Sequence, residues 1–253
     1  MRKIRIIPRL DIKGPNLIKG IHLEGLRVIG DPAEFATSYY GSGADELIYT
    51  DVVASLYGRN SLHDIIMHTA SRIFVPLTVG GGVRSVSDVE SLLSVGADKI
   101  SLNTAAIEDK TLVTKIAEAF GSQCCVIEVQ AKNVGQGKWT AMYNNGREQS
   151  GLDAVDWACE AVKLGAGEVL VTSIDREGTR KGMDLELTAE IAKSVNVPVI
   201  ASGGVGSKKD VTEAAIKGHA DAVSIADLFH YKRGTIAEVK SALNNSGIAV
   251  RST

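Results

Sequence analysis

The segment PLTVGGGVRSVSD, residues 76–88, recurs as PVIASGGVGSKKD at residues 198–210, 122 positions further along the chain. A second set of matches has the same offset: GADE at Gly43 with GAGE at Gly165, and GADK at Gly96 with GHAD at Gly218. Self-similarity at a fixed offset is the signature of an internal repeat. The 253-residue chain is therefore predicted to be a single domain, 1–253, built of two related halves, 1–122 and 123–253.

Within each half, short runs rich in β-branched residues alternate with amphipathic stretches. Eight such runs are candidate strands, namely 4–10, 46–51, 75–80, 99–104, 124–129, 168–173, 198–203 and 222–226. The stretches between them have apolar residues three to four positions apart and end at glycine, as helices do; examples are 32–43, 87–96 and 153–165. Repeated strand–helix units predict parallel strands with right-handed crossovers. Two equal halves favour a closed α/β (β/α)8 TIM barrel over an open doubly wound sheet.

Composition excludes several classes of protein. Lys and Arg total 28 and Asp and Glu total 30, so a net charge of −2 provides no overall positive field for nucleic acid or an anionic membrane. Arg5 and Arg9 interrupt the N-terminal apolar run, so this run is not expected to be a signal peptide. No apolar run approaches the roughly 20 residues of a membrane span. The three cysteines match no metal spacing and fit a reducing compartment. We expect a cytoplasmic protein without a metal ion or an organic cofactor.

In a (β/α)8 barrel the active site is formed at the C-terminal ends of the strands. In this chain those ends carry Asp11, Asp51, Gly80 to Gly82, Asn103, Thr104, Gln130, Thr172, Ser173, Gly203, Gly204, Ala226 and Asp227, with Asp175 close by. Glycine clusters let backbone N–H groups approach an anion closely, although one cluster alone would be explained by a tight turn. Two clusters at repeat-related positions predict two phosphate sites. The first comprises Gly81, Gly82, Asn103 and Thr104, the second Gly203, Gly204, Ala226 and Asp227, and Thr172 is a further substrate-binding candidate.

Several segments resemble the cyclase subunit of imidazole glycerol phosphate synthase, the HisF family. The resemblance covers nearly the whole chain and is carried by IIPRLDIK (6–13), GADELIYTD (43–51), PLTVGGGVRS (76–85), GADKISLNTAA (96–106), FGSQC (120–124), GLDAVDWACEAVKLGAGEVLVTSIDREGT (151–179) and PVIASGGVG (198–206). The sister isomerase of histidine biosynthesis shares the two-half barrel, but GLDAVDWA and TSIDREGT resemble the cyclase.

The resemblance implies a reaction, a partner and a set of site residues. Such cyclases take ammonia from a glutaminase docked on the N-terminal face of the barrel. They use it on a ribonucleotide with two phosphates, and they form imidazole glycerol phosphate and an aminoimidazole carboxamide ribotide. Asp11 matches one of the family's two acid–base aspartates and points inward by parity with Arg5 and Arg9. Lys19 matches a lysine that closes over substrate, and Asp175 matches a further aspartate near the site.

Four charged residues at the starts of strands share this inward parity: Arg5, Glu46, Lys99 and Glu168. Charges that point into a barrel are costly unless they pair, so two of each sign are expected to form a ring at the bottom. In the family such a ring is the entrance gate for ammonia. A purely structural plug is the alternative.

Four positions depart from the family pattern. Gln130 replaces the second acid–base aspartate, and an amide cannot exchange a proton near neutral pH, which costs on the order of 10²–10⁴ in the rate of that step. Asp227 replaces a serine that binds the second phosphate, and a carboxylate there would repel it. Arg9 and Glu128 replace a small cysteine and alanine one inward step below Asp11 and Gln130. We expect them to form a buried ion pair that narrows or gates the ammonia route.

Three functions stay open at this stage. The first is a divergent cyclase that tolerates Gln130. The second is a paralogue that delivers ammonia to a surface-polysaccharide sugar, converting an acetamido group to an amidine; LRVIGDP (26–32) resembles those relatives. The third is a catalytically weak barrel that acts as a scaffold or conduit for its glutaminase.

Overall fold

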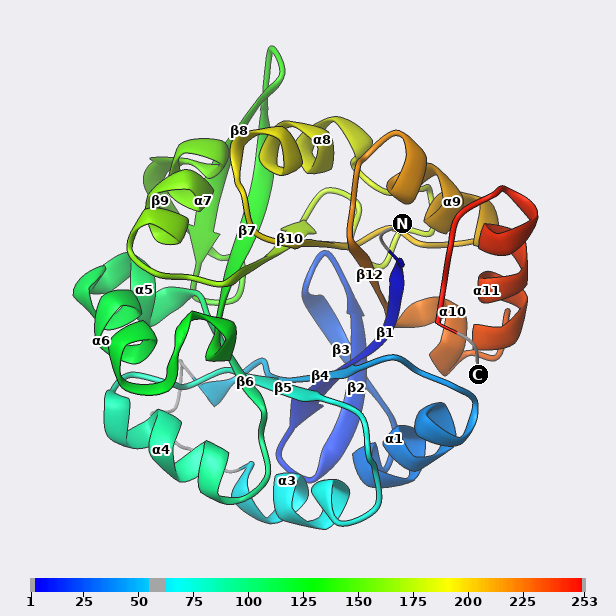
Figure 1. Cartoon of the computed structure of the whole chain (residues 1–253), viewed down its shortest axis with the longest axis horizontal. Helices are drawn as coiled ribbons and strands as arrows, with labels where there is room; N and C mark the ends of the chain where they lie inside the picture. The colour runs from blue at the N-terminus through cyan, green and yellow to red at the C-terminus, as the bar shows by residue number, and fades with distance from the viewer. Residues whose placement is uncertain (1–2, 55–61, 252–253) are drawn as a thin grey trace.

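The protein is a closed barrel of eight parallel strands with helices around it (Figure 1). The computed structural model describes residues 3–54 and 62–251. In order around the barrel the strands are β1 (Arg5–Lys13), β4 (Leu47–Asp51), β5 (Leu77–Gly80), β6 (Lys99–Leu102), β7 (Cys125–Gly135), β10 (Glu168–Ser173), β11 (Val199–Ser202) and β12 (Ala222–Ile225). Pairing of β7 with β10 and of β12 with β1 completes the ring. The predicted (β/α)8 barrel is confirmed, while its division into two halves stays a prediction.

The helices lie on the outside of the ring. They are α1 (Pro32–Gly41), α3 (His63–Ala70), α4 (Val86–Ser94), α5 (Thr104–Glu108), α6 (Thr111–Phe120), α7 (Ala154–Lys163), α8 (Leu185–Ser194), α9 (Lys208–Ile216), α10 (Asp227–His230) and α11 (Ile236–Asn245), with a 3-10 turn η1 (Ser122–Cys124). Asp31 caps the N-terminus of α1 and Asp153 caps that of α7, because each carboxylate accepts backbone N–H groups of the first turn. In the part of the chain that the structure describes, no helix is long and apolar enough to cross a membrane.

Two antiparallel hairpins extend the barrel strands. Strands β2 (Asn16–Ile21) and β3 (Glu24–Gly30) continue from β1, and β8 (Lys138–Tyr143) and β9 (Glu148–Asp153) continue from β7. The first hairpin contains Lys19. Its tip is fastened across the barrel, since Leu23 packs against Met142 and Ile174 and the N–H of His22 donates to Glu177 O at 2.9 Å. The segment that carries Lys19 is therefore folded over the C-terminal face.

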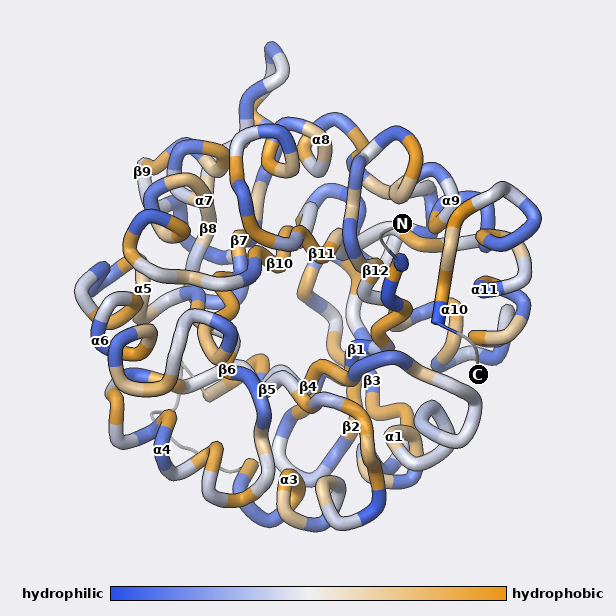
Figure 2. Tube along the Cα trace, in the orientation of Figure 1, coloured by the Kyte–Doolittle hydropathy of each residue, from blue (hydrophilic) through white to orange (hydrophobic). Residues whose placement is uncertain are grey.

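Alternation of side chains along each strand separates two hydrophobic regions. Outward-facing strand residues pack under the helices in the main core, with Trp157 as its largest fully buried side chain. Figure 2 shows hydrophobic residues along the strands and alternating polar and apolar stretches along the helices. A second cluster consists of the inward-facing Ile7, Ile48, Val126, Leu170, Ile200 and Ala222. This apolar layer inside the barrel separates a charged layer at the strand starts from a polar layer at the strand ends.

Candidate active site

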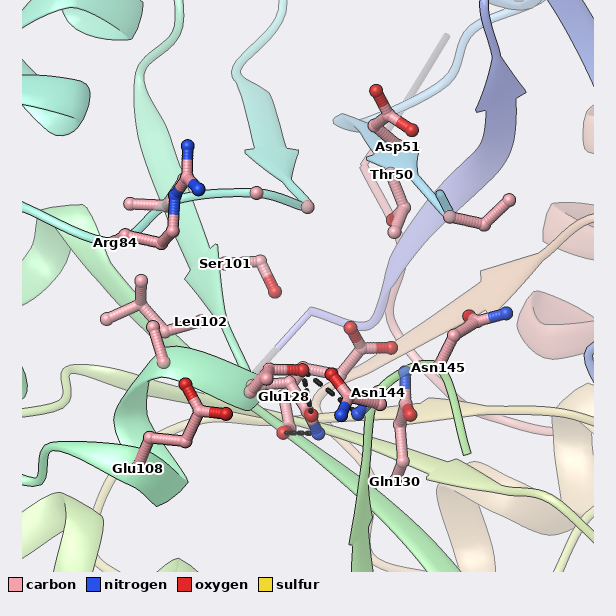
Figure 3. A pocket seen from close by; sticks show the side chains of 17 residues that line it. Thr50, Asp51, Arg84, Ser101, Leu102, Glu108, Glu128, Gln130, Asn144 and Asn145 are labelled. Atoms are coloured by element: carbon pink, nitrogen blue, oxygen red, sulfur yellow. Dashed lines mark hydrogen bonds between the residues drawn. The ribbon is translucent and has the colours of Figure 1, made fainter. Parts of the chain in front are cut away.

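The larger of the two cavities that contain the predicted phosphate-site residues has a volume of about 230 Å³ and lies over β4 to β7 (Figure 3). Its lining includes all four residues expected to form the first phosphate site: Gly81, Gly82, Asn103 and Thr104. Gly81 has a φ of +93°, and a Cβ there would lie 2.2 Å from the carbonyl oxygen of Asp51. A residue with a side chain cannot adopt this close approach, so glycine is required to shape the wall of the cavity.

The polar wall of this cavity is held by the β8–β9 hairpin. The amide nitrogen of Asn103 donates to the carbonyl oxygens of Glu128 and Met142 at 3.0 and 3.1 Å. Thr104 Oγ1 accepts the N–H of Asn144 at 3.0 Å. The β8–β9 hairpin therefore positions the side chains of Asn103 and Thr104.

A smaller cavity lies over β11 and β12 and is lined by Gly203, Gly204, Ala226 and Asp227, the second predicted phosphate site. Its volume is only about 20 Å³, roughly the space of one water molecule. Lys19 also lines it, and it forms a buried ion pair with Glu177. The Asp227 carboxylate pairs with Arg233, which offsets the repulsion that this carboxylate would exert on an anion. A phosphate group would fit here only after these side chains move.

A buried ion-pair network lies between the two cavities. Arg9 Nε donates to Asp11 Oδ1 at 2.9 Å, and Arg9 Nη1 donates to Glu128 Oε1 at 2.8 Å. All three side chains are at most 5% exposed. The expected Arg9–Glu128 ion pair is therefore confirmed. Thr172 lies inside this network rather than on either cavity wall, because its hydroxyl contacts Arg9 Nη1 at 3.2 Å and Glu128 Oε1 at 3.3 Å.

The charges in this network stabilise one another. Burial disfavours ionisation of Asp11, but Arg9 and Lys19 outweigh that effect and lower the pKa of the Asp11 carboxyl. Burial also disfavours the Lys19 cation, yet Glu177 and Asp11 raise its pKa. Asp11 is consequently a carboxylate at neutral pH, the form that can accept a proton but cannot donate one.

At the opposite end of the barrel, the four charged residues expected at the bottom form an alternating ring. Arg5 pairs with Glu46 at 2.7 Å and with Glu168. Lys99 bridges the same two carboxylates at 2.9 and 3.0 Å. Burial disfavours the charged form of Glu46, but Arg5 and Lys99 outweigh it and lower the pKa of the carboxyl. The ring closes the N-terminal end of the barrel, and its two positive and two negative charges sum to zero.

Asp175 is the one predicted catalytic residue that the structure does not bring to this region. It is exposed, accepts the N–H of Asn133 at 2.7 Å, and lies in a separate surface hollow. The carboxylate that reaches Lys19 belongs to Glu177, two positions later, because the turn after β10 directs that side chain inward. The sequence did not predict Glu177, because this residue lies in a turn. Alternation along a strand indicates the direction of a side chain only within the strand.

Thr50 and Ser101 were also missed, although parity with Glu46 and Lys99 could have identified them as inward-facing. Both line the larger cavity. Gln130 lines it as well and is 4% exposed. Within residues 3–54 and 62–251, no three His, Cys, Asp or Glu side chains are placed to hold a metal ion.

The fold and the site first define a class: a (β/α)8-barrel enzyme with carboxylates and glycine-lined cavities on its C-terminal face, an arrangement suited to a small phosphorylated substrate. Comparison with known proteins defines the family. Residues 5–235 match the family model described as histidine biosynthesis protein. The chain is 59% identical over 210 residues to imidazole glycerol phosphate synthase subunit HisF of Legionella pneumophila, covering 83% of this chain and 99% of that protein. It is 47% identical over 247 residues to the subunit of the same name in Bacillus cereus (strain Q1), covering 98% of each. The chain therefore belongs to the HisF family, the cyclase subunits of imidazole glycerol phosphate synthase in histidine biosynthesis, and the expectation drawn from its motifs is confirmed.

Proposed function

We propose that this protein uses ammonia from a partner glutaminase to convert a bis-phosphorylated ribonucleotide into imidazole glycerol phosphate and an aminoimidazole carboxamide ribotide. The observation that carries the proposal, beside family membership, is the buried Asp11 carboxylate between two glycine-lined cavities. A substrate with a phosphate at each end would span these cavities and pass over Asp11. The reactive carbon atoms would then lie beside a group that accepts protons.

The roles of the site residues follow from their contacts. Asp11 acts as the general base, since Arg9 and Lys19 keep it ionised. Gly81, Gly82, Asn103 and Thr104 bind one phosphate through backbone N–H groups and polar side chains. Gln130 orients the substrate by hydrogen bonding, because its amide does not titrate. The proton that the family's second aspartate would transfer must come from another group or from water.

The glutaminase is proposed to dock on the N-terminal face, over the ring formed by Arg5, Glu46, Lys99 and Glu168. Ammonia is small and uncharged, so the apolar layer above this ring suits its passage better than that of an ion. The ring would have to open for entry, which requires at least one of its ion pairs to separate. A cytoplasmic location for this complex stays a prediction.

A second acceptor deserves a direct comparison because the second cavity is small. At about 20 Å³, it favours an acceptor with one phosphate over one with two. The alternative acceptor is the sugar whose acetamido group becomes an amidine. Loss of turnover while ammonia is still delivered would instead support the scaffold function.

The experiment that tests the proposal is ammonium-dependent turnover of the ribonucleotide by the purified protein, beside Gln130→Asp. Turnover by the wild type would establish a cyclase in which another group replaces the missing aspartate. An inactive wild type with activity in Gln130→Asp would show an intact substrate site that lacks one acid–base group. Asp11→Asn is the control and is expected to be inactive in either background. If wild type and Gln130→Asp are both inactive, the cyclase proposal is wrong and sugar acceptors should be assayed next.

A further inference from the structure

We propose that Arg9 is a further catalytic residue: its Nη2 donates a hydrogen bond to the carbonyl oxygen on the carbon atom that ammonia attacks, with the Ser224 hydroxyl as a second donor. The inference rests on the proposed function in taking ammonia as the attacking reactant. It adds to that function a group that stabilises the negative charge developing on the oxygen. Arg9 comes from β1 and Ser224 from β12, and both line the smaller cavity.

The first argument is a pair of buried polar groups without partners. Arg9 donates from Nε to Asp11 and from Nη1 to Glu128. Arg9 Nη2 and Ser224 Oγ, in contrast, make no hydrogen bond to any described residue, and both side chains are 3% exposed. Nη2 can only donate, whereas the hydroxyl can donate or accept, so a group that binds both must be an acceptor. Buried donors normally have an acceptor, and this pair therefore indicates an oxygen atom supplied by a ligand.

The second argument is that the charges on the wall of this cavity are already compensated. Each charged side chain there has a partner of opposite charge: Arg9 pairs with two carboxylates, Lys19 with Glu177, and Asp227 with Arg233. The unused N–H groups of Arg9 therefore suit an uncharged oxygen better than an anion, whose charge would have no counterpart. The space of about 20 Å³ is also that of one small group. A carbonyl oxygen meets both conditions, and the glycines at the strand ends are left for phosphate.

The third argument is the position of Arg9 in the barrel. It follows Ile7 of the inner apolar layer by one inward step along β1. Its partner Glu128 lies on β7, four strands further around the ring of eight, and lines the larger cavity (Figure 3). The pair therefore crosses the middle of the barrel directly above the layer proposed for ammonia. A carbonyl carbon bound beside Arg9 would face the incoming ammonia.

The proposed step balances in atoms and charge. Ammonia forms a bond to the carbonyl carbon, and an electron pair of the C=O bond moves to the oxygen, where the Arg9 and Ser224 donors stabilise it. Arg9 keeps its own proton, because a guanidinium does not ionise near neutral pH. Asp11 takes a proton from the added nitrogen and passes it to the oxygen, twice in succession. The oxygen then leaves as water, so that C=O and ammonia give C=N–H and one water molecule.

Infrared difference spectroscopy of the full chain tests the contact without requiring turnover. The ribonucleotide, isotopically labelled at its carbonyl carbon, is bound in the absence of ammonium, so that it stays intact. We expect its C=O stretching frequency to fall on binding, because two donors polarise the bond. Arg9→Lys keeps a cation between Asp11 and Glu128 but lacks the third nitrogen, and Ser224→Ala removes the second donor. Each variant should return the frequency toward its value in solution.

Thr78→Val is the matched control. The Thr78 hydroxyl is also buried and without a partner among the described residues, but Thr78 lines neither of the two cavities. This variant should keep the wild-type frequency and the wild-type rate. Ser224→Ala removes a hydroxyl that holds no other group, so it is expected to fold and carries the test if Arg9→Lys does not. A water molecule bound there for structural reasons alone would leave Ser224→Ala with the wild-type frequency and kcat, and that result would overturn the proposal.

Kinetics supply a second readout if the wild type turns over with ammonium. We expect kcat to fall about 10²–10³-fold in Arg9→Lys and about tenfold in Ser224→Ala, with little change in the KM for the ribonucleotide. The loss in Arg9→Lys should persist at every pH at which the wild type is active. If Arg9 acted only by keeping Asp11 ionised, activity would instead return as the pH rises, and the proposed contact with substrate would be wrong.

Failure of the proposed cyclase can be told apart from failure of this inference. The acetamido group of the alternative sugar acceptor also presents a carbonyl to ammonia. If the ribonucleotide shows no shift, N-acetylglucosamine carrying an anomeric phosphate and labelled at the acetyl carbonyl is measured in the same way. A shift with the sugar that Ser224→Ala reverses would support the role of Arg9 and count against the cyclase. If neither compound shows such a shift, the inference is wrong, whether or not the wild type turns over.

Discussion

Replacing Glu128 by leucine is expected to destabilise the protein strongly, because it leaves the Arg9 guanidinium partly unpaired inside the barrel. Arg9 is 3% exposed and Glu128 is 4% exposed, with 2.8 Å between the paired atoms. Removing one partner of a buried ion pair costs about 3–5 kcal/mol. Arg9 still pairs with Asp11 at 2.9 Å in this variant. We therefore expect the free energy of unfolding to fall by about 3 kcal/mol, near the lower end of that range. For a chain of this size that corresponds to a fall in Tm of about 6–12 °C.

The double variant Arg9→Met/Glu128→Leu shows whether the pair, rather than either side chain, carries the effect. Buried ion pairs are often replaced by apolar residues at little cost. The double variant should therefore be more stable than the sum of the single variants implies, by about 1–3 kcal/mol of coupling. Urea unfolding followed by circular dichroism measures all four proteins, with Glu108→Leu on the cavity rim as an exposed control expected within about 0.5 kcal/mol of wild type. A Glu128→Leu cost below about 1 kcal/mol, or strictly additive costs, would show that the reasoning is wrong.

Two further outcomes are expected. Burial lowers the pKa of His230 to about 4 from an unfolded value near 6.5, so the unfolded chain binds more protons between these pH values and the folded state loses stability as pH falls through this range. His230→Asn keeps a polar partner for Tyr39 and should reduce this loss of stability by about 3 kcal/mol. Urea unfolding at pH 6.5 and at pH 4 measures the loss in each protein. An equal fall in the free energy of unfolding in wild type and variant would contradict the prediction. Gly81→Ala should destabilise by about 2 kcal/mol or more, since its Cβ would meet Asp51 O at 2.2 Å. Gly247→Ala is the matched control, because Gly247 also has a positive φ but open space around it, and it should cost only about 1 kcal/mol; equal costs would argue against a steric role for Gly81.

The barrel could be predicted from sequence because it depends on local and periodic signals. β-Branched runs, helix ends at glycine and the 122-residue repeat are each readable along the chain. All eight predicted strands are present, seven of them within three residues of the expected bounds, while β7 continues six residues beyond its expected end, to Gly135. Hairpin β2–β3 was not predicted, since its pairing with β1 depends on a turn at Gly14 rather than on a period.

Parity along strands also identified which charges point into the barrel. A side-chain period of two assigns Arg5, Arg9 and Asp11 to the same face of β1, and the same rule places Glu128 beside Arg9 across the barrel. The ring at the bottom and the Arg9–Glu128 pair followed from this rule and from the cost of unpaired buried charge. The residues that make these contacts lie within strands, where the backbone fixes the direction of each side chain.

Only the tertiary structure decided what happens beyond the strand ends. There the turn after β10 selects Glu177 over Asp175, the folded hairpin buries Lys19, and the second cavity is reduced to about 20 Å³. The buried ion-pair network likewise joins residues from separate segments, which no single stretch of sequence reveals. The physical reason is that a strand repeats its geometry every two residues, whereas a turn has no period, so its side chains take the directions that packing against distant segments allows.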